Sequence, residues 1–182
     1  MSDFDGYLIT PSGLPYSQML PDDIVAMSMD SEDSHRHRSP SSEWRFHRDI
    51  YRTRPEIGAV VHTHAPYATT LACMNRAIPP FHYMVAIAGG RDIRCAPYAT
   101  FGTQTLSDHA VAALADRRAC LLAHHGMIGI GATLDAALAV ALEVETLAEM
   151  YWRLLQHGEP ALLADAEMEI TLEKFRTYGQ PR

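Results

Sequence analysis

Short apolar runs alternate along this chain with longer segments that carry helical signals, and this alternation limits the folds that the chain can adopt. Residues 57–64 form one such run and predict a buried strand. A helix is predicted before the run, over residues 42–54, because Ser42 is a good N-cap. Another is predicted after it, over residues 66–74, because Pro66 suits the first position of a helix. Strands that alternate with helices predict a mixed α/β fold.

The other segments of the chain continue this pattern. Further strands are predicted over residues 7–10, 24–29, 83–86, 93–96 and 119–123. Further helices are predicted over residues 107–115, 133–156 and 165–179. In the longest of them a set of leucines predicts a buried stripe: Leu134, Leu138, Leu142, Leu147 and Leu154. No Gly/Pro-rich linker interrupts the 182 residues, so residues 1–182 are expected to form a single domain.

The charge of the chain excludes some classes of function. Its 22 acidic and 15 basic residues give a formal net charge of -7, which argues against nucleic acid as a partner, because such binding relies on basic side chains. The first residues do not have the pattern of a secretory signal, and no apolar run is long enough to span a bilayer. We therefore expect a cytoplasmic protein without a membrane partner. Cys73, Cys95 and Cys120 are widely spaced in apolar surroundings and are expected to be reduced core residues.

The ten histidines of this chain include two groups at predicted strand ends. His62 and His64 are two residues apart, so in a strand their side chains project from the same face. A catalytic zinc site usually has three protein ligands and one open position, so a third ligand is required. The best source is the pair His124 and His125, which follows the strand predicted over residues 119–123; adjacent residues face opposite ways, so one of the pair is expected to reach the metal. A single His-x-His motif is a weak signal, and the alternative is that these are core or surface histidines.

Glu43 lies close in the sequence to these candidate ligands. It directly follows Ser41 and Ser42, and His47 lies one helical turn further along. The helix dipole favours an acid in the first turn of a helix, so Glu43 has a structural explanation as well as a catalytic one. Its position shortly before the strand that carries His62 favours the catalytic one.

Several segments together resemble one family, the class II aldolases of the aldolase/adducin superfamily, and within it most closely the branch that acts on L-fuculose 1-phosphate. They are ITPSGLPY (residues 9–16), PSSEWRFH (40–47), VVHTHA (60–65), HYM (82–84), CAPYATFGT (95–103), LLAHHG (121–126) and EKFRTYG (173–179). The resemblance extends from Gly6 to Gly179, and so many ordered matches are far more specific than one motif. It implies a single three-layer α/β/α domain with a central, mainly antiparallel sheet.

The resemblance also implies a metal site and a reaction. His62, His64 and His125 would bind one Zn²⁺ per subunit, and Glu43 would be the catalytic acid and base. The implied reaction is the reversible cleavage of a small sugar phosphate, L-fuculose 1-phosphate or a similar ketose 1-phosphate, to dihydroxyacetone phosphate and an aldehyde such as L-lactaldehyde. Zinc would stabilise the negative charge that develops as the carbon-carbon bond breaks.

Other members of the superfamily provide the alternatives. A 4-epimerase, a decarboxylase or a dehydratase could use the same metal site, but the epimerases resemble Ser-Ser-Asp where this chain has Glu43. An adducin-like interaction module would not bind a metal, and the intact histidines argue against it.

Further positions complete the site that the resemblance implies. The substrate phosphate would bind at Ser12, Gly13, Ser41 and Ser42. Tyr83 would reach the site of a neighbouring subunit, and Tyr178 would join from the C-terminal tail, whereas without the resemblance packing explains both tyrosines. Sites of this family lie between subunits, which implies a homotetramer.

The beginning of the sequence departs from the family pattern. Family members usually carry an amino-terminal helix and a first strand that ends in a Gly-Asn-x-Ser loop of the phosphate pocket. The given sequence starts where that strand would turn into the next one. The metal site is therefore expected to be complete, whereas weaker phosphate binding and a less stable sheet edge at residues 7–10 are expected.

Overall fold

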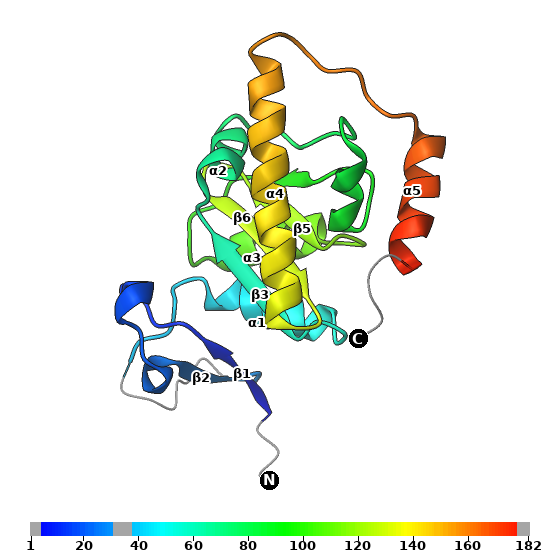
Figure 1. The fold of residues 1–182 in the computed structure, drawn as a ribbon. Helices are drawn as coiled ribbons and strands as arrows, with labels where there is room; N and C mark the ends of the chain where they lie inside the picture. The colour runs from blue at the N-terminus through cyan, green and yellow to red at the C-terminus, as the bar shows by residue number, and fades with distance from the viewer. Residues whose placement is uncertain (1–4, 31–37, 178–182) are drawn as a thin grey trace.

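The strands of the described residues form two sheets in the computed structural model, which describes residues 5–30 and 38–177 (Figure 1). The larger sheet has the strand order β3 (Ala59–Thr63), β6 (Gly126–Gly131), β5 (Ala119–Leu122) and β4 (Arg94–Ala96). In it, β3 and β5 each pair antiparallel with β6, and β4 pairs parallel with β5. The smaller sheet is the antiparallel pair of β1 (Gly6–Ile9) and β2 (Val25–Ser28). The central sheet is thus mixed and mainly antiparallel, as expected.

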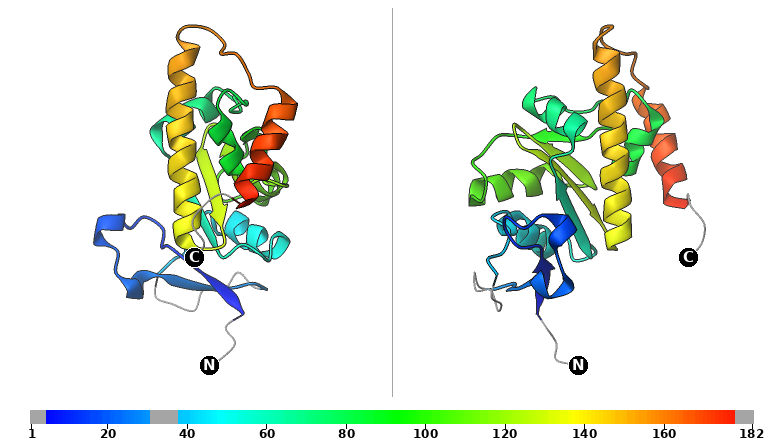
Figure 2. Two further views of the ribbon diagram at one scale, coloured as in Figure 1. Left: turned by 45° about the vertical axis from the view of Figure 1, so that its right-hand side comes forward. Right: turned by 60° about the vertical axis from the view of Figure 1, so that its left-hand side comes forward.

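Helices cover both faces of the larger sheet. Their bounds are α1 (Trp44–Thr53), α2 (Pro66–Cys73), α3 (Gln104–Ala113), α4 (Leu134–Leu155) and α5 (Asp165–Thr177), with short 3-10 helices η1 (Tyr16–Gln18), η2 (Pro21–Asp23) and η3 (Tyr83–Ala88). Figure 2 shows α4 on one side of the strands and α1 and α3 on the other. The helix-sheet-helix layers confirm the predicted α/β/α class. None of the helices in the described part of the chain has both the length and the apolar composition needed to cross a membrane.

Alternation of side chains along the strands divides the core into two halves. Leu121 of β5 and Met127 of β6 pack in a cluster with residues of α2 and α4, whereas Cys120 and Ile128 pack in a second cluster with residues of α1 and α3. Each of these four side chains is 0% exposed. Burial of one aliphatic side chain contributes about 1.5–3 kcal/mol, so both faces stabilise the sheet.

The sequence pattern does not predict β6, because glycines are depleted in strands. The packing of α4 explains two glycines of β6, Gly129 and Gly131. A Cβ atom on Gly131 would lie 2.6 Å from the backbone nitrogen of Ala137, and one on Gly129 would lie 3.1 Å from the carbonyl oxygen of Ala137. The absence of side chains therefore lets α4 lie directly on the sheet.

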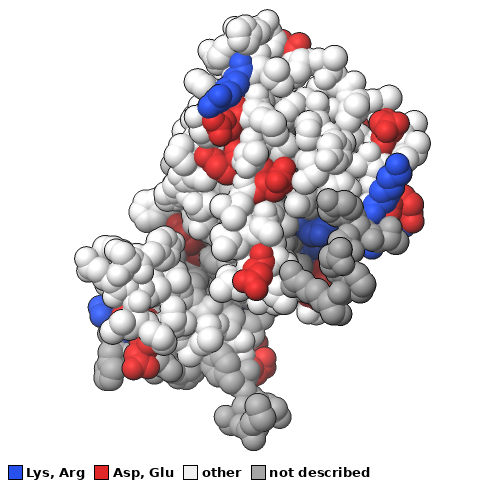
Figure 3. Space-filling model, in the orientation of Figure 1, with Lys and Arg blue, Asp and Glu red and all other residues white. Residues whose placement is uncertain are grey.

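The prediction that a stripe of leucines on α4 is buried is wrong. Leu134, Leu138, Leu142 and Leu154 are 66%, 46%, 62% and 41% exposed, and of the predicted stripe Leu147 alone is buried. The buried face of the helix also contains smaller residues, namely Ala137, Val140, Ala141, Val144 and Ala148. These side chains fit the close approach to β6, which bulkier leucines would prevent. On the side of the molecule that faces the viewer in Figure 3, most of the surface is uncharged, with scattered acidic groups and fewer basic ones.

Residues 83–86, predicted as a strand, belong to η3 instead. The ring of His82 accepts a hydrogen bond from the amide of Met84 at 3.3 Å, which caps the start of this 3-10 helix. Gly89 ends it with a positive φ of 83°, a conformation that favours glycine. A short apolar run identifies burial but does not separate a strand from a helical turn, which explains the wrong prediction.

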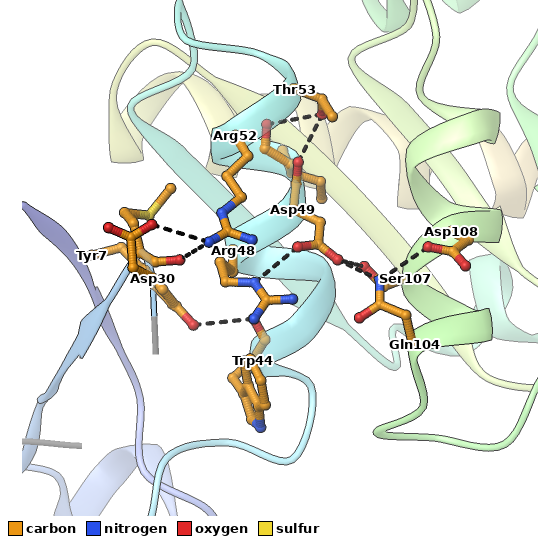
Figure 4. Close-up of polar contacts among 12 residues, drawn as sticks. Tyr7, Asp30, Trp44, Arg48, Asp49, Arg52, Thr53, Gln104, Ser107 and Asp108 are labelled. Atoms are coloured by element: carbon orange, nitrogen blue, oxygen red, sulfur yellow. Dashed lines mark hydrogen bonds and ion pairs between the residues drawn. The ribbon is translucent and has the colours of Figure 1, made fainter. Parts of the chain in front are cut away.

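The carboxylate of Asp49 in α1 connects this helix to α3 through hydrogen bonds (Figure 4). Its Oδ2 atom accepts hydrogen bonds from Nε2 of Gln104 at 2.6 Å and from Oγ of Ser107 at 2.7 Å. Its Oδ1 atom accepts one from Nε of Arg48 at 2.9 Å. Burial raises the pKa of Asp49, but these hydrogen bonds outweigh it and hold the pKa below its ordinary value. This contact holds the helix that begins directly after Glu43.

The cysteines only partly match the expectation of core residues. Cys120 is fully buried and Cys95 half-buried, but Cys73 is exposed. All three are free thiols. Burial raises the pKa of Cys95 to about 11, which keeps this thiol protonated at neutral pH.

Candidate active site

Three histidine side chains meet at one end of the larger sheet. His62 lies in β3, His64 directly follows the last residue of β3, and His125 lies in the turn between β5 and β6. The ring centroids are 4.9–5.0 Å apart, and one nitrogen of each ring lies within 4.8 Å of the others. His125 is thus the member of the adjacent pair that joins, whereas the ring of His124 contacts Tyr98 at a centroid distance of 5.9 Å. We refer to the three residues as the three-histidine cluster.

The surroundings of His62 determine which of its nitrogens is available. Nδ1 lies 2.9 Å from the carbonyl oxygen of Met127, and a carbonyl oxygen only accepts, so Nδ1 carries the hydrogen. Nε2 is then left with its lone pair, and this atom is buried without a hydrogen-bond partner among the described residues. The edge of the Phe46 ring packs against the imidazole at a centroid distance of 5.3 Å. A buried nitrogen of this kind is costly unless it has a ligand.

The three-histidine cluster fits a transition-metal ion. Imidazole nitrogens are suitable ligands for zinc and related metals, provided that they are neutral. Burial, partly opposed by the hydrogen bond to Met127, lowers the pKa of His62 to about 3, and burial also lowers the pKa of His125. Both rings are therefore neutral at physiological pH. Three protein ligands beside a cleft leave one position open, which is the arrangement of a catalytic site.

Glu43 is a buried carboxylate in the same cleft. It is 6% exposed, its Oε2 atom has no hydrogen-bond partner among the described residues, and its Oε1 atom lies 3.4 Å from Oγ of Ser42. Burial raises its pKa, while the amide of Gly102, the Ser42 hydroxyl and the charge of His64 act in the opposite direction. A carboxyl with a raised pKa is suited to proton transfer.

The predicted N-cap of α1 is displaced by one residue. Glu43, not Ser42, occupies the N-cap position, and α1 begins at Trp44. No side-chain hydrogen bond caps the helix, so the carboxylate of Glu43 is not used for capping. It lines the cleft instead.

A cleft of about 780 Å³ contains most of the predicted site residues. Its lining includes the predicted phosphate-binding positions Ser12, Gly13, Ser41 and Ser42, together with Glu43 and the three-histidine cluster. Two backbone hydrogen bonds of 3.0 Å hold the serine segments together, from Ser12 to Ser39 and from Ser41 to Thr10. Lys and Arg are absent from the lining contributed by described residues, so an anion would be bound by amides and hydroxyls.

The structure describes one of the two predicted tyrosines. Tyr83 is the first residue of η3, is 52% exposed and is not part of the lining. Tyr178 lies outside the described residues.

The structure adds lining residues that the sequence pattern does not assign. Tyr16, Tyr98 and Phe101 line the cleft and are 77%, 59% and 67% exposed. His124 lines it as well and has a left-handed backbone with φ of 54°. The signal that could have pointed to the first three is an aromatic residue in a loop, because loops carry a disproportionate share of binding residues.

The fold and this site define the class to which the chain belongs. The sequence model of the family described as Class II Aldolase and Adducin N-terminal domain matches residues 2–152. The chain therefore belongs to the class II aldolase and adducin family.

Individual relatives are similar over nearly the whole chain. The 5-methylthioribulose-1-phosphate/5-deoxyribulose-1-phosphate aldolase of Rhodospirillum rubrum is 63% identical over 96% of this chain and 79% of its own length. The L-fuculose phosphate aldolase of Escherichia coli K12 is 49% identical over 96% of this chain and 81% of its own length. A solved structure of an L-fuculose 1-phosphate aldolase matches with a TM-score of 0.90 and 42% identity, over 94% of this chain and 81% of that one.

Proposed function

We propose that this chain is a zinc-dependent aldolase that cleaves a ketose 1-phosphate to dihydroxyacetone phosphate and an aldehyde, with residues 1–182 as its single domain. The observation that carries the proposal is that the buried carboxylate of Glu43 and the three-histidine cluster line the same cleft. Membership of the class II aldolase and adducin family supports it.

His62, His64 and His125 would hold one Zn²⁺ per subunit. The partnerless Nε2 atom of His62 and the neutral state of its ring support this assignment. When bound, zinc supplies a Lewis acid that stabilises negative charge on the oxygens of the substrate.

Glu43 is the proposed acid and base. Cleavage between C3 and C4 of the ketose removes a proton from the C4 hydroxyl and later delivers a proton to C3. One carboxylate can do both if it lies within hydrogen-bond reach of each atom. The Oε2 atom of Glu43 has no partner among the described residues and is therefore free to accept the proton. Its raised pKa brings proton uptake closer to neutral pH.

Ser12, Gly13, Ser41 and Ser42 are the proposed phosphate-binding residues. They line the cleft close to the start of α1, a helix of 10 residues. Backbone N–H groups at a helix start have no partner within the helix, and together with serine hydroxyls they bind an anion without a basic side chain. A phosphate there would lie in the same cleft as the three-histidine cluster.

Tyr83 and Tyr178 are proposed to act in a homotetramer. Tyr83 is exposed and does not line the cleft of its own chain, which suits a residue that serves a neighbouring subunit. Tyr178 would close the same site from the C-terminal tail.

The names of the relatives suggest three candidate substrates of two kinds. The 5-deoxyribulose 1-phosphates, with hydrogen or a methylthio group at C5, are the first candidates, because the R. rubrum relative with 63% identity is named for them. The exposed rings of Tyr98 and Phe101 offer an apolar wall to a terminal methyl or methylthio group, which suits these substrates and L-fuculose 1-phosphate alike. L-Fuculose 1-phosphate is the second candidate, supported by 49% identity to the E. coli enzyme.

A substrate panel tests the proposal. The three ketose 1-phosphates are incubated with the protein, with and without a chelator, and dihydroxyacetone phosphate is measured. We expect release from at least one substrate, loss of release with chelator, and recovery when zinc is added. Glu43→Gln should lower kcat about 10²–10⁴-fold while zinc stays bound, and His124→Ala, a change in the same cleft, should lower it far less. No release from any substrate in the presence of zinc would contradict the aldolase assignment.

A further inference from the structure

Glu145, in the middle of α4, provides the acceptors for the start of α2. Its Oε1 atom accepts a hydrogen bond from the amide of Tyr67 at 2.9 Å, and its Oε2 atom accepts one from the amide of Ala68 at 2.8 Å. The N-cap residue of α2 is Ala65, which makes no side-chain cap. The first N–H groups of a helix have no partner within the helix. Glu145 therefore caps α2 from 77 residues away in the sequence.

This cap lies next to the metal site. Only His64 and Ala65 stand between the last residue of β3, Thr63, and the first residue of α2, Pro66. Pairing of β3 with β6 fixes one end of this two-residue connection, because Thr63 is opposite Met127. The start of α2 fixes the other end. The backbone of His64 is therefore held between a sheet and a helix start.

The position of the His64 ring depends on its backbone more than the position of the His62 ring does. The ring of His62 is oriented by its hydrogen bond to the Met127 carbonyl. His64 is exposed, and within the described part of the chain its ring makes contacts with the other two histidine rings but no such bond. A shift of the first turn of α2 would thus move the His64 nitrogen directly.

The hydrogen bonds of Glu145 are separate from the apolar packing of α2 on α4. Ala68 and Leu71 of α2 pack with Val144, Leu147 and Ala148 of α4 in one buried cluster. This apolar contact keeps α2 on α4 when the carboxylate is removed. The loss of the carboxylate is then confined to the first turn of α2, where two partly buried amides lose their acceptors.

We propose that Glu145 is a positioning residue for the metal site, which it supports by holding the start of α2 and so the backbone of His64. The inference rests on the proposed function, because it takes the three-histidine cluster to be a zinc site. Groups that orient metal ligands typically change metal affinity by about 10–100-fold when removed.

The test compares zinc affinity with stability in three variants. Glu145→Ala removes both acceptors, and Glu145→Gln keeps one oxygen on a side chain of nearly the same size. Thr133→Ala is the matched control. The hydroxyl of Thr133 accepts a hydrogen bond of 3.2 Å from the amide of Ala136 and so caps α4, at the end of β6 remote from His125. Zinc dissociation constants and the Tm of the metal-free proteins are measured. The visible spectrum of each protein with Co²⁺ in place of zinc reports the geometry of the ligands.

We expect Glu145→Ala to weaken zinc binding at least about tenfold and to alter the Co²⁺ spectrum, with a smaller effect for Glu145→Gln. Thr133→Ala should lower Tm while leaving zinc affinity and spectrum unchanged. Equal zinc affinity in Glu145→Ala and the wild type would overturn this inference but not the proposed function. A loss of zinc affinity in Thr133→Ala as large as that in Glu145→Ala would do the same. If Glu145→Ala does not fold, Glu145→Gln decides the question by the same criteria. A wild-type protein that binds no zinc would overturn the proposed function and the inference together.

Discussion

The carbonyl oxygen of Met127 accepts a hydrogen bond of 2.9 Å from Nδ1 of His62, across the pairing of β3 with β6. This bond fixes the tautomer and the rotation of the imidazole, because only one nitrogen can carry the hydrogen. The sheet therefore presents Nε2 of His62 as an electron-pair donor before any metal arrives. The two other histidines lie just beyond strand ends, where the same sheet determines their separation.

Replacement of His62 is expected to abolish metal binding. His62→Ala removes one of the three proposed ligands, so zinc content should fall from about one per chain to near zero. His124→Ala is the control, because His124 lines the cleft but is outside the three-histidine cluster, and it should retain zinc. Metal content of the purified proteins, measured by atomic emission, checks this. Full zinc content in His62→Ala would show that the metal lies elsewhere.

Glu43→Gln is expected to stabilise the metal-free protein at about pH 7. Burial raises the pKa of Glu43, so its ionised form is less favourable in the folded chain than in the unfolded chain. This destabilisation is fully present above the folded pKa and disappears as the pH falls to the unfolded pKa of about 4.3, where the carboxyl is protonated in both states. The difference in Tm between the variant and the wild type, measured with chelator, should therefore shrink from about pH 7 to about pH 4. A difference that is independent of pH would show that the charge is not its cause.

Asp49→Asn is expected to destabilise the protein by about 1–3 kcal/mol at neutral pH, because it weakens three hydrogen bonds between α1, α3 and the carboxylate (Figure 4). The pKa of Asp49 is lowered in the folded chain, so its stabilisation is present above the unfolded pKa and is lost as the pH falls through the folded pKa. Urea unfolding at several pH values checks this. The control is Asp108→Asn. Among the described residues, this carboxylate accepts one hydrogen bond, an exposed one from Gln104, so the change should cost less than about 0.5 kcal/mol. Equal costs for both variants would contradict the special role of Asp49.

Gly126→Ala is expected to impair the metal site through packing. A Cβ atom on Gly126 would lie 2.5 Å from the carbonyl oxygen of Thr63 and 2.9 Å from Cδ2 of His64. The backbone must shift, at a cost of about 1–3 kcal/mol, and His64 moves with it. Gly131→Ala is the matched control, since it creates a clash of 2.6 Å with Ala137 at the other end of β6. Both variants should lower the free energy of unfolding, and only Gly126→Ala should weaken zinc binding; the same zinc affinity in both would contradict this.

Several elements could be predicted because their signals are local. The helix predicted over residues 42–54 corresponds to α1, and the strand predicted over residues 57–64 corresponds to β3. Helix-start signals and apolar runs involve neighbouring residues, so they can be recognised without knowledge of distant contacts. Other elements could not. Gly129 and Gly131 of β6 are explained by the approach of α4. The apolar run at residues 83–86 is a partly buried 3-10 turn, too short for its period to be recognised.

Some features of the candidate site could likewise be predicted from the sequence, and others depend on the tertiary structure. That His62 and His64 share one face follows from the alternation of side chains in a strand, which is a property of neighbouring residues. Strand alternation left His124 and His125 as alternatives, and the family resemblance indicated His125. The structure gives the physical reason: in the turn between β5 and β6, His124 has a left-handed backbone and its ring contacts Tyr98 instead. The exposed leucines of α4 reverse the expectation from helical spacing, because the sheet selects the face with smaller side chains.

The sequence by itself determined the α/β class, most of the helices and strands, and the residue types available for a metal and a proton. Only the tertiary structure decided how closely the three histidines meet, how deeply Glu43 is buried, and that Glu145 caps α2. The physical reason is the range of the interactions: periodicity and capping signals act between neighbours in the chain, whereas burial, pKa and ligand geometry depend on contacts between segments as far apart as β3 and α4.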